Sequence, residues 1–261
     1  MAYIGYISLF LALSASVYSA VAFSFGIARG RRQTLLDSAR NGLIAATGLV
    51  SLSSIILIVA FLTHNFQIEY VYMYSSTDTP LAYLISGLWA GNNGSLLLWA
   101  WLLSIFAAIV VQQKRIVDND LLPYAAAIIM ITQSFFLILL LVVSNPFQEL
   151  GFIPTDGNGL NPLLENPGMV IHPPVILAGY VAATVPFAFA ISALVMGRLG
   201  NEWIIRMRKW TLVTWLLLGV GNVLGAWWAY VELGWGGVLG LGSGRECRIY
   251  ALASSNRFFA L

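Results

Sequence analysis

The chain contains the segment Leu122–Val143, LPYAAAIIMITQSFFLILLLVV, which carries no Asp, Glu, Lys or Arg. A helix needs about 20 apolar residues to cross the roughly 30 Å hydrocarbon core of a bilayer. Lipid offers no hydrogen-bond partners, so a spanning backbone must satisfy its own groups, as a helix does. This segment therefore predicts a transmembrane helix.

Five further segments meet the same requirement. The N-terminal one lacks a basic leading region and a small-residue cleavage site, so we expect a retained helix instead of a signal peptide. The third is the shortest and is expected to begin earlier, because Leu81–Trp89 is amphipathic enough to lie in the membrane interface. The pattern predicts an all-α integral membrane protein with about six transmembrane helices. The five segments are Ile4–Gly26, Gly42–Thr63, Ser95–Val111, Pro174–Gly197 and Thr211–Tyr230.

The composition agrees with a membrane protein. Of the 261 residues, 59% are hydrophobic and 9% are charged, and the mean hydropathy is +0.82. Soluble domains carry about 25% charged residues, so a soluble fold is excluded. A net charge of +2 gives no indication of a nucleic-acid partner. The single cysteine, Cys247, excludes a disulfide framework or a cysteine-rich metal site within one copy.

The basic residues predict the orientation. Ten of the thirteen Lys and Arg residues lie in the first, third and fifth connections, and the other three lie near the C-terminus. The second and fourth connections have no basic residue and carry five acidic ones. Positive connections remain in the cytoplasm. We therefore expect the N-terminus and the C-terminal tail on the outer, periplasmic side. The ten are Arg29, Arg31, Arg32, Arg40, Lys114, Arg115, Arg198, Arg206, Arg208 and Lys209.

The fourth connection, Asn145–His172, is rich in proline and glycine. Such a loop has fixed turns and few helical alternatives. It fits a rigid lid over the bundle and, equally, a binding loop held by a membrane scaffold.

Two histidines face the predicted outer side. His172 lies in the sequence VIHPP, where we expect Pro173 and Pro174 to set the start of the fifth helix. Its imidazole fits an interfacial polar cap, or a ligand to a metal or a haem iron. His64, at the end of the second helix, fits a polar cap better than a ligand.

Tryptophan and glycine are dense in two further places. Trp89–Ser95 forms a small polar turn before the third helix, which Ser95 is expected to cap. Gly225–Gly237, at the end of the sixth helix, reads GAWWAYVELGWGG. An aromatic belt at the membrane surface explains some of these rings. A flat apolar platform for a planar ligand would need this combination of rings and close backbone.

Five motifs in this order resemble the haem lyase subunits of cytochrome c maturation, of the CcmF/NrfE type. They are WAGNNGSLLLW, SNPF, GLNPLLENPGMVIHPPVILAGYV, PFAFA and LGAWWAYVELGWGG. The resemblance covers about the N-terminal third of a typical member. It implies a multi-pass protein of the bacterial inner membrane, working on its periplasmic face, that attaches haem to apocytochrome c.

The resemblance also implies site residues, a cofactor and partners. His172 would be an axial ligand to the haem iron, and Trp227, Trp228 and Trp235 would lead into the haem platform. The cofactor is a b-type haem that becomes c-type once its vinyl groups add to the thiols of a CxxCH segment. Because this chemistry requires positioning, no catalytic residue is expected. Implied partners are a haem chaperone, apocytochrome c and other maturation proteins of the same lipid bilayer.

The resemblance ends abruptly after Gly237, where the family continues with a motif close to WGGxWxWDPVENA. A one-base shift of a plausible coding sequence for Val238 onwards translates as YWAWDPVENAAFMPW. We therefore expect residues 1–237 to form the N-terminal haem-handling region and residues 238–261 to be a frameshifted, aberrant tail. The nucleotide sequence past the codon of Tyr230 tests this, because it must contain a one-base route to the motif.

Without the platform motif, we expect this polypeptide to bind haem weakly or not at all and to lack lyase activity alone. A transporter or channel subunit is the alternative from another class. Ionisable side chains inside spans mark transport paths, and these spans have them only at their edges. A non-catalytic scaffold of the maturation complex is a further alternative. Reconstituted flux would favour transport, and haem transfer from a donor chaperone would favour the lyase.

Overall fold

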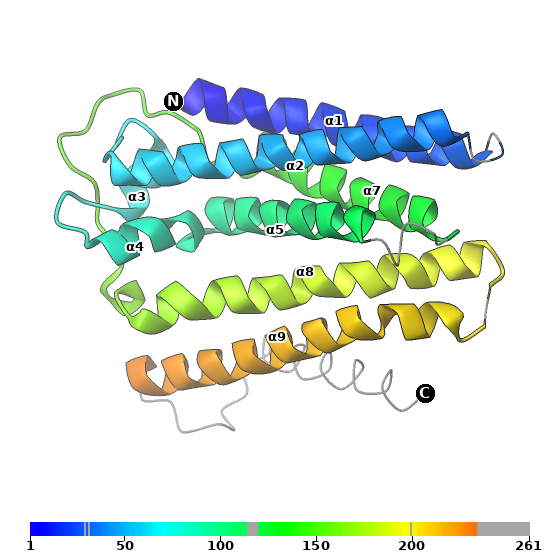
Figure 1. The fold of residues 1–261 in the computed structure, drawn as a ribbon. Helices are drawn as coiled ribbons and strands as arrows, with labels where there is room; N and C mark the ends of the chain where they lie inside the picture. Colours follow the sequence, from blue (N-terminus) through cyan, green and yellow to red (C-terminus); the bar gives the residue numbers. More distant parts are fainter. Residues whose placement is uncertain (29, 31, 114–119, 199, 234–261) are drawn as a thin grey trace.

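The computed structural model describes residues 1–28, 30, 32–113, 120–198 and 200–233. Within these residues, six helices are long and apolar enough to cross a membrane, which confirms the predicted all-α, multi-pass architecture. Figure 1 shows them side by side. The six are α1 (Ala2–Ala28), α2 (Gln33–Leu62), α5 (Asn92–Gln112), α7 (Leu122–Val142), α8 (Pro167–Val195) and α9 (Glu202–Leu233).

Three helices begin well before the predicted start of their spans. These are α2 at Gln33, α8 at Pro167 and α9 at Glu202. Hydropathy detects the part of a helix that lies in lipid, whereas the helical backbone continues into the polar region beyond it. The expectation that Pro173 and Pro174 mark the start of the fifth helix is wrong, because both lie inside α8.

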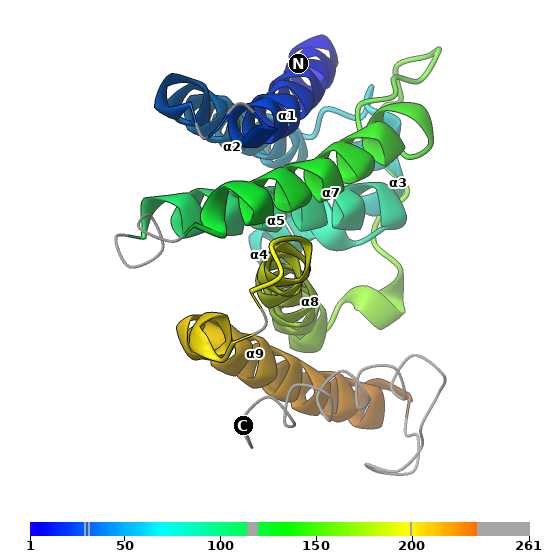
Figure 2. The same cartoon turned by 90° about the vertical axis from the view of Figure 1, so that its right-hand side faces the viewer.

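Helices that follow one another in the chain pack together, most extensively α1 with α2 and α8 with α9. Helix α1 packs against α2 and α7, and α5 contacts α2, α7 and α8. Helix α9 packs mainly against α8, at the edge of the bundle in both views (Figures 1 and 2). A large part of the α9 surface is therefore not covered by the other described helices, and only 17% of the residues in its apolar window are buried.

The two ends of the bundle differ in character. One end, called the loop end below, holds the N-terminus, α3 (Glu69–Tyr74), α4 (Leu81–Ser86) and the short helices η1 (Gly87–Trp89) and η2 (Pro162–Leu164) (Figure 1). The opposite end, called the basic end, carries the helix connections rich in Lys and Arg. There Arg198, after α8, forms an exposed ion pair with Asp120, before α7. The orientation of these two ends across the membrane stays a prediction from the sequence.

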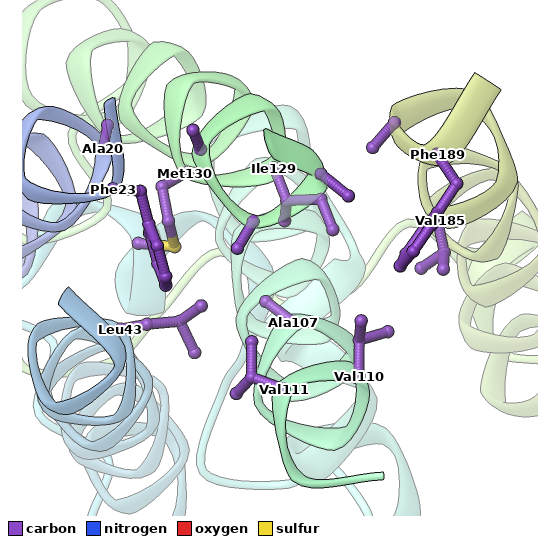
Figure 3. Packing of buried hydrophobic residues seen from close by; sticks show 14 of the residues in the cluster. Ala20, Phe23, Leu43, Ala107, Val110, Val111, Ile129, Met130, Val185 and Phe189 are labelled. Atoms are coloured by element: carbon purple, nitrogen blue, oxygen red, sulfur yellow. The ribbon is translucent and has the colours of Figure 1, made fainter. Parts of the chain in front are cut away.

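The interior is built mostly from small and branched apolar side chains. Figure 3 shows Phe23, Leu43 and Met130 meeting between α1, α2 and α7, in the half of the core nearer the basic end. Small residues let membrane helices approach closely. Further across, the Trp99 ring of α5 stacks between Phe136 of α7 and Tyr180 of α8, with ring centroids 5.2 and 5.9 Å apart. This stack joins the three central helices.

Candidate functional site

At the loop end, the proline-rich connection between α7 and α8 is hydrogen-bonded to the connection between α2 and α5. The amide of Glu69 donates to the carbonyl of Gln148, and the amide of Leu150 donates to the carbonyl of Gln67, both at 2.9 Å. Further along, the amide of Asn158 donates to the carbonyl of Tyr72 at 2.8 Å. The two connections, together called the loop cover below, are therefore joined by backbone hydrogen bonds at this end of the bundle.

An exposed carboxylate reinforces this cover. Asp156 accepts hydrogen bonds from the amide and hydroxyl of Thr77, at 2.9 and 3.0 Å, and from the amide of Gly157 at 2.7 Å. The pKa of Asp156 lies below its ordinary value because these donors favour the ionised carboxylate. The amide of Thr77 contributes most to this lowering, and the amide of Gly157 contributes next. The bonds to Thr77 join residues far apart in the sequence.

The turn before α5 is built around Tyr70. The Tyr70 hydroxyl accepts a hydrogen bond from the Gly91 amide at 2.9 Å, and its side chain is 4% exposed. The expectation that Ser95 caps the third helix is wrong. Helix α5 begins at Asn92 with Gly91 at the N-cap, and Ser95 lies inside the helix, where its hydroxyl donates to the carbonyl of Trp89 at 3.1 Å.

Burial raises the pKa of the Tyr70 phenol well above its ordinary value of about 10. We therefore expect stability to decline as the pH rises above about 10, because the unfolded chain then releases a proton that the folded chain retains. Below that pH the contribution is fully present. For this one group the slope approaches about 1.4 kcal/mol per pH unit. Unfolding measured from pH 9 to 11 should show the slope in the parent and a smaller one in Tyr70→Phe; equal slopes contradict the prediction.

Helix α8 is fixed at its start by asparagine. The side chain of Asn166 caps the helix by accepting from the amide of Gly168 at 2.8 Å. Its amide group donates to the Glu232 carboxylate of α9 at 2.7 Å. One side chain therefore caps α8 and ties it to the end of α9, so the loop ends of the two helices have a fixed relative position.

Trp89 compensates for a proline inside α8. Pro173 has no amide hydrogen, so the carbonyl four residues earlier, that of Met169, loses its helical partner. The Trp89 indole N–H donates to the Met169 carbonyl at 2.9 Å. The helix thus keeps its geometry beside His172 because a side chain from the η1 turn replaces the missing backbone donor.

We expect Trp89→Phe to destabilise the protein by about 1–3 kcal/mol, because the Met169 carbonyl would be left without a donor near the membrane. Thermal unfolding in detergent, followed by circular dichroism, measures the loss. Trp215→Phe is the matched control, since this ring is 39% exposed on the outward side of α9. Equal changes in the two variants would contradict the role of the indole N–H.

His172 lies inside the α8–α9 interface and is 7% exposed, deeper than an interfacial cap would be. Its Nδ1 is 2.8 Å from the carbonyl oxygen of Gly221. A carbonyl can only accept, so Nδ1 carries the hydrogen, and in the neutral ring the lone pair is on Nε2. A β-carbon on Gly225 would stand 2.5 Å from Cε1 of the imidazole, so the absence of a side chain there makes room for the ring.

Trp228 is the aromatic neighbour of His172. The two ring centroids are 6.0 Å apart. The indole also covers Gly168, where a β-carbon would lie 2.5 Å from Cγ of Trp228. Its Nε1 is buried without a hydrogen-bond partner in the described part of the chain. The structure therefore places an unpaired donor close to the imidazole.

Two of the remaining candidate residues, Trp227 and His64, lie within the described part of the chain. Trp227 is 45% exposed, and Trp235 lies outside the described residues. His64 follows the end of α2 with a positive φ of 50° and packs its ring 5.7 Å from that of Phe66. No cluster of three His, Cys, Asp or Glu side chains suited to a metal ion occurs among the residues that the structure describes.

Sequence reasoning missed the links that hold His172 in place. The roles of Gly221, Asn166 and Glu232 depend on which turn of α9 faces which turn of α8, and the sequence does not specify that register. Trp89 could have been found from the sequence: a proline inside a span leaves a carbonyl that needs a donor, and Trp89 is an indole donor in a neighbouring motif.

Taken together, these features define a class: a multi-pass α-helical membrane protein in which a buried histidine lies beside a half-buried tryptophan between two spanning helices. The sequence matches the family described as Cytochrome C assembly protein over residues 89–240, and the chain belongs to this family.

Relatives and a solved structure give a consistent picture. The chain is 40% identical over 235 residues to the cytochrome c-type biogenesis protein CcmF of Pseudomonas aeruginosa, covering 90% of this chain and 36% of that protein. It is 34% identical over 234 residues to the biogenesis protein NrfE of Haemophilus influenzae, with 90% and 37% covered. A solved structure of the cytochrome c haem lyase CcmF superposes with a TM-score of 0.78 at 28% identity, over 90% of this chain and 37% of the other. The chain spans little more than a third of these relatives.

Proposed function

We propose that this chain forms the N-terminal part of a membrane haem lyase of cytochrome c maturation and that His172 is an axial ligand to the haem iron. The observation that carries the proposal is the hydrogen bond from Nδ1 to the Gly221 carbonyl. Ligating histidines almost always donate their second ring nitrogen to a carbonyl, a carboxylate or water, which fixes the tautomer and orients the ring. The bond to Gly221 does the same for His172.

Three tryptophans are proposed to complete the contacts to haem as the substrate. Trp228 supplies an apolar ring beside the imidazole, and its buried Nε1–H suits an acceptor such as a haem carboxylate. Trp227 and Trp235 are proposed to extend the apolar surface toward the part of the site that follows residue 237.

The burial of His172, which is 7% exposed, also limits access to the site. Haem would reach iron-binding distance only where neighbouring rings move or a larger assembly opens the interface.

In this proposal the chain contributes binding and orientation. Nε2 of His172 would hold the iron of a bound haem, and Trp228 would orient the macrocycle beside it. Thioether formation needs the thiols of an apocytochrome and the vinyl groups of haem, which this chain does not supply. We place the loop end on the periplasmic side of the bacterial inner membrane, where a haem chaperone, apocytochrome c and other maturation proteins would meet it.

Co-expression tests this proposal. The chain is produced alone, or together with the downstream two thirds of the Pseudomonas aeruginosa relative, and haem is quantified as the pyridine haemochrome of the purified protein. We expect little haem with the chain alone and near-stoichiometric haem with the pair. His172→Ala should lower the ratio on the order of 10-fold or more, whereas His64→Ala should not change it. Stoichiometric haem on the isolated chain, or retention by His172→Ala, would contradict the proposal.

A scaffold of the maturation complex is the second candidate, favoured by the face of α9 that the other described helices do not cover. In that case the downstream segment would bind the chain, and the haem content of the co-expressed pair would not change on His172→Ala. A transport role gains no support, because the midplane residues of the described spans carry no ionisable side chain.

A further inference from the structure

The buried core consists of two apolar clusters that follow one another along the bundle. The cluster nearer the basic end includes Phe23 of α1 and Met130 of α7. The cluster nearer the loop end includes Leu9 of α1 and Leu137 of α7. The residues between them on the two helices include Ser16 and Gln133, which are fully buried. A polar layer thus separates the two halves of the core at the centre of the membrane-spanning region.

Ser16 and Gln133 have no hydrogen-bond partner within the described part of the chain. For Gln133 this holds for both the side-chain nitrogen and the oxygen, and for Ser16 it holds for the hydroxyl. The next residue of α7 behaves differently, because the Ser134 hydroxyl donates to the carbonyl of Met130 at 2.8 Å. A buried polar side chain on these helices can thus bond within its own helix, as Ser134 does, whereas Ser16 and Gln133 do not.

The helical geometry places the two side chains at the same depth. Ala20 and Phe23 of α1 lie close to Met130 of α7 (Figure 3). The two helices run in opposite directions, so one turn toward the loop end leads from Ala20 to Ser16 and from Met130 to Gln133. Helices α1 and α7 pack directly against each other. The hydroxyl and the amide thus face the same interior level.

An amide without hydrogen bonds is costly in a water-free interior, where each unsatisfied group costs several kcal/mol. We propose that Gln133 and Ser16 bind a buried water molecule between α1 and α7. A glutamine amide offers two donors and an acceptor, and a serine hydroxyl offers both kinds, so together they provide the two to four partners that a buried water needs. Both side chains are uncharged, which favours a neutral molecule of this size over an ion.

The rest of the layer is satisfied by the protein itself. On α2, the Thr47 hydroxyl donates to the carbonyl of Ser104 at 3.0 Å, and the Trp101 indole donates to the Ser51 hydroxyl at 2.9 Å. The water would complete the layer on the α1–α7 side. It would also fix the axial register of α1 against α7, because the hydrogen bonds form only when both side chains lie at the same depth along the bundle.

The test combines a density map with a double-mutant cycle on the full chain in detergent. A cryo-electron microscopy or crystal map at about 2 Å should show a peak within hydrogen-bond distance of both Gln133 and Ser16. Ser16→Ala and Gln133→Leu should each lower Tm by about 3 °C, and the double variant should lose no more than the larger single loss.

Three outcomes would overturn the proposal. One is a map with no peak or with a direct bond between the two side chains. Another is an additive loss in the double variant. The third is a higher Tm for Gln133→Leu, which is the expected result where a buried amide without partners is replaced by an apolar side chain of similar size. Ser134→Ala, which removes a hydroxyl bonded within its own helix, is the matched control and should show no coupling to Gln133→Leu.

Discussion

Gly94→Ala is expected to prevent the chain from accumulating in its folded form. Gly94 lies in the first turn of α5, and a β-carbon there would overlap the carbonyl oxygen of Leu88 and the hydroxyl of Tyr70. The first of these is backbone and the second belongs to a buried ring that supports the Gly91 amide. Neither can move without disrupting the turn. Overpacking commonly costs about 1–3 kcal/mol, and this site should exceed that range, to about 4 kcal/mol.

The measurement is the yield of monodisperse protein in detergent, with unfolding followed in any folded fraction. Gly48→Ala is the control, because a β-carbon at Gly48, inside α2, would meet nothing within 4 Å. Alanine has the better helix propensity, so Gly48→Ala should be neutral or stabilising by up to about 1 kcal/mol. A Gly94→Ala protein with the yield and Tm of the parent would show that the turn before α5 is not the fixed structure described here.

The six spans were predictable because the membrane imposes one strong condition on sequence. A segment such as Leu122–Val143 has to be apolar over its length, and that property is local. Helix ends were harder to predict. Helix α8 begins at Pro167 because the Asn166 side chain caps it, and a local cap of this kind does not register in hydropathy. Pro173 lies inside α8 and not at its start, because Trp89, about 80 residues earlier in the chain, donates to the carbonyl that the proline leaves without a partner.

The role of His172 as a haem ligand stays a prediction, and the structure adds the surroundings of its ring. His172 was identified from a motif, and the structure adds that Trp228 is its neighbour, whereas Trp227 is not. Adjacent residues of a helix point about 100° apart, so only one of two consecutive tryptophans can face a given neighbour. Which one does so depends on the rotation of α9 about its axis. That rotation is set by Gly221 and Gly225, and these contacts involve residues more than 45 positions from His172.

Gly225→Ala is the second large effect that we expect, and it acts on His172. The new methyl group would lie 2.5 Å from Cε1 of the imidazole and 3.0 Å from Nδ1, so the ring must leave the position in which Nδ1–H donates to the Gly221 carbonyl. We expect a loss of about 2–3 kcal/mol in stability, from overpacking and from a buried carbonyl without a donor. In the co-expressed pair, haem content should fall on the order of 10-fold, as for loss of the bond that orients a ligand.

A double-mutant cycle separates this mechanism from general damage to α9. With His172→Ala already present, the ring that the methyl group strikes is gone, and Gly225→Ala should then cost less than about 0.5 kcal/mol. The stability cycle needs no haem, so it tests the contact even if the chain proves not to bind haem. Should the two losses add fully, the methyl group acts on another part of α9. Should they couple while haem content stays unchanged, the packing is as described but His172 does not ligate the iron. The two results together therefore distinguish a residue that stabilises the α8–α9 interface from one that also presents a ligand.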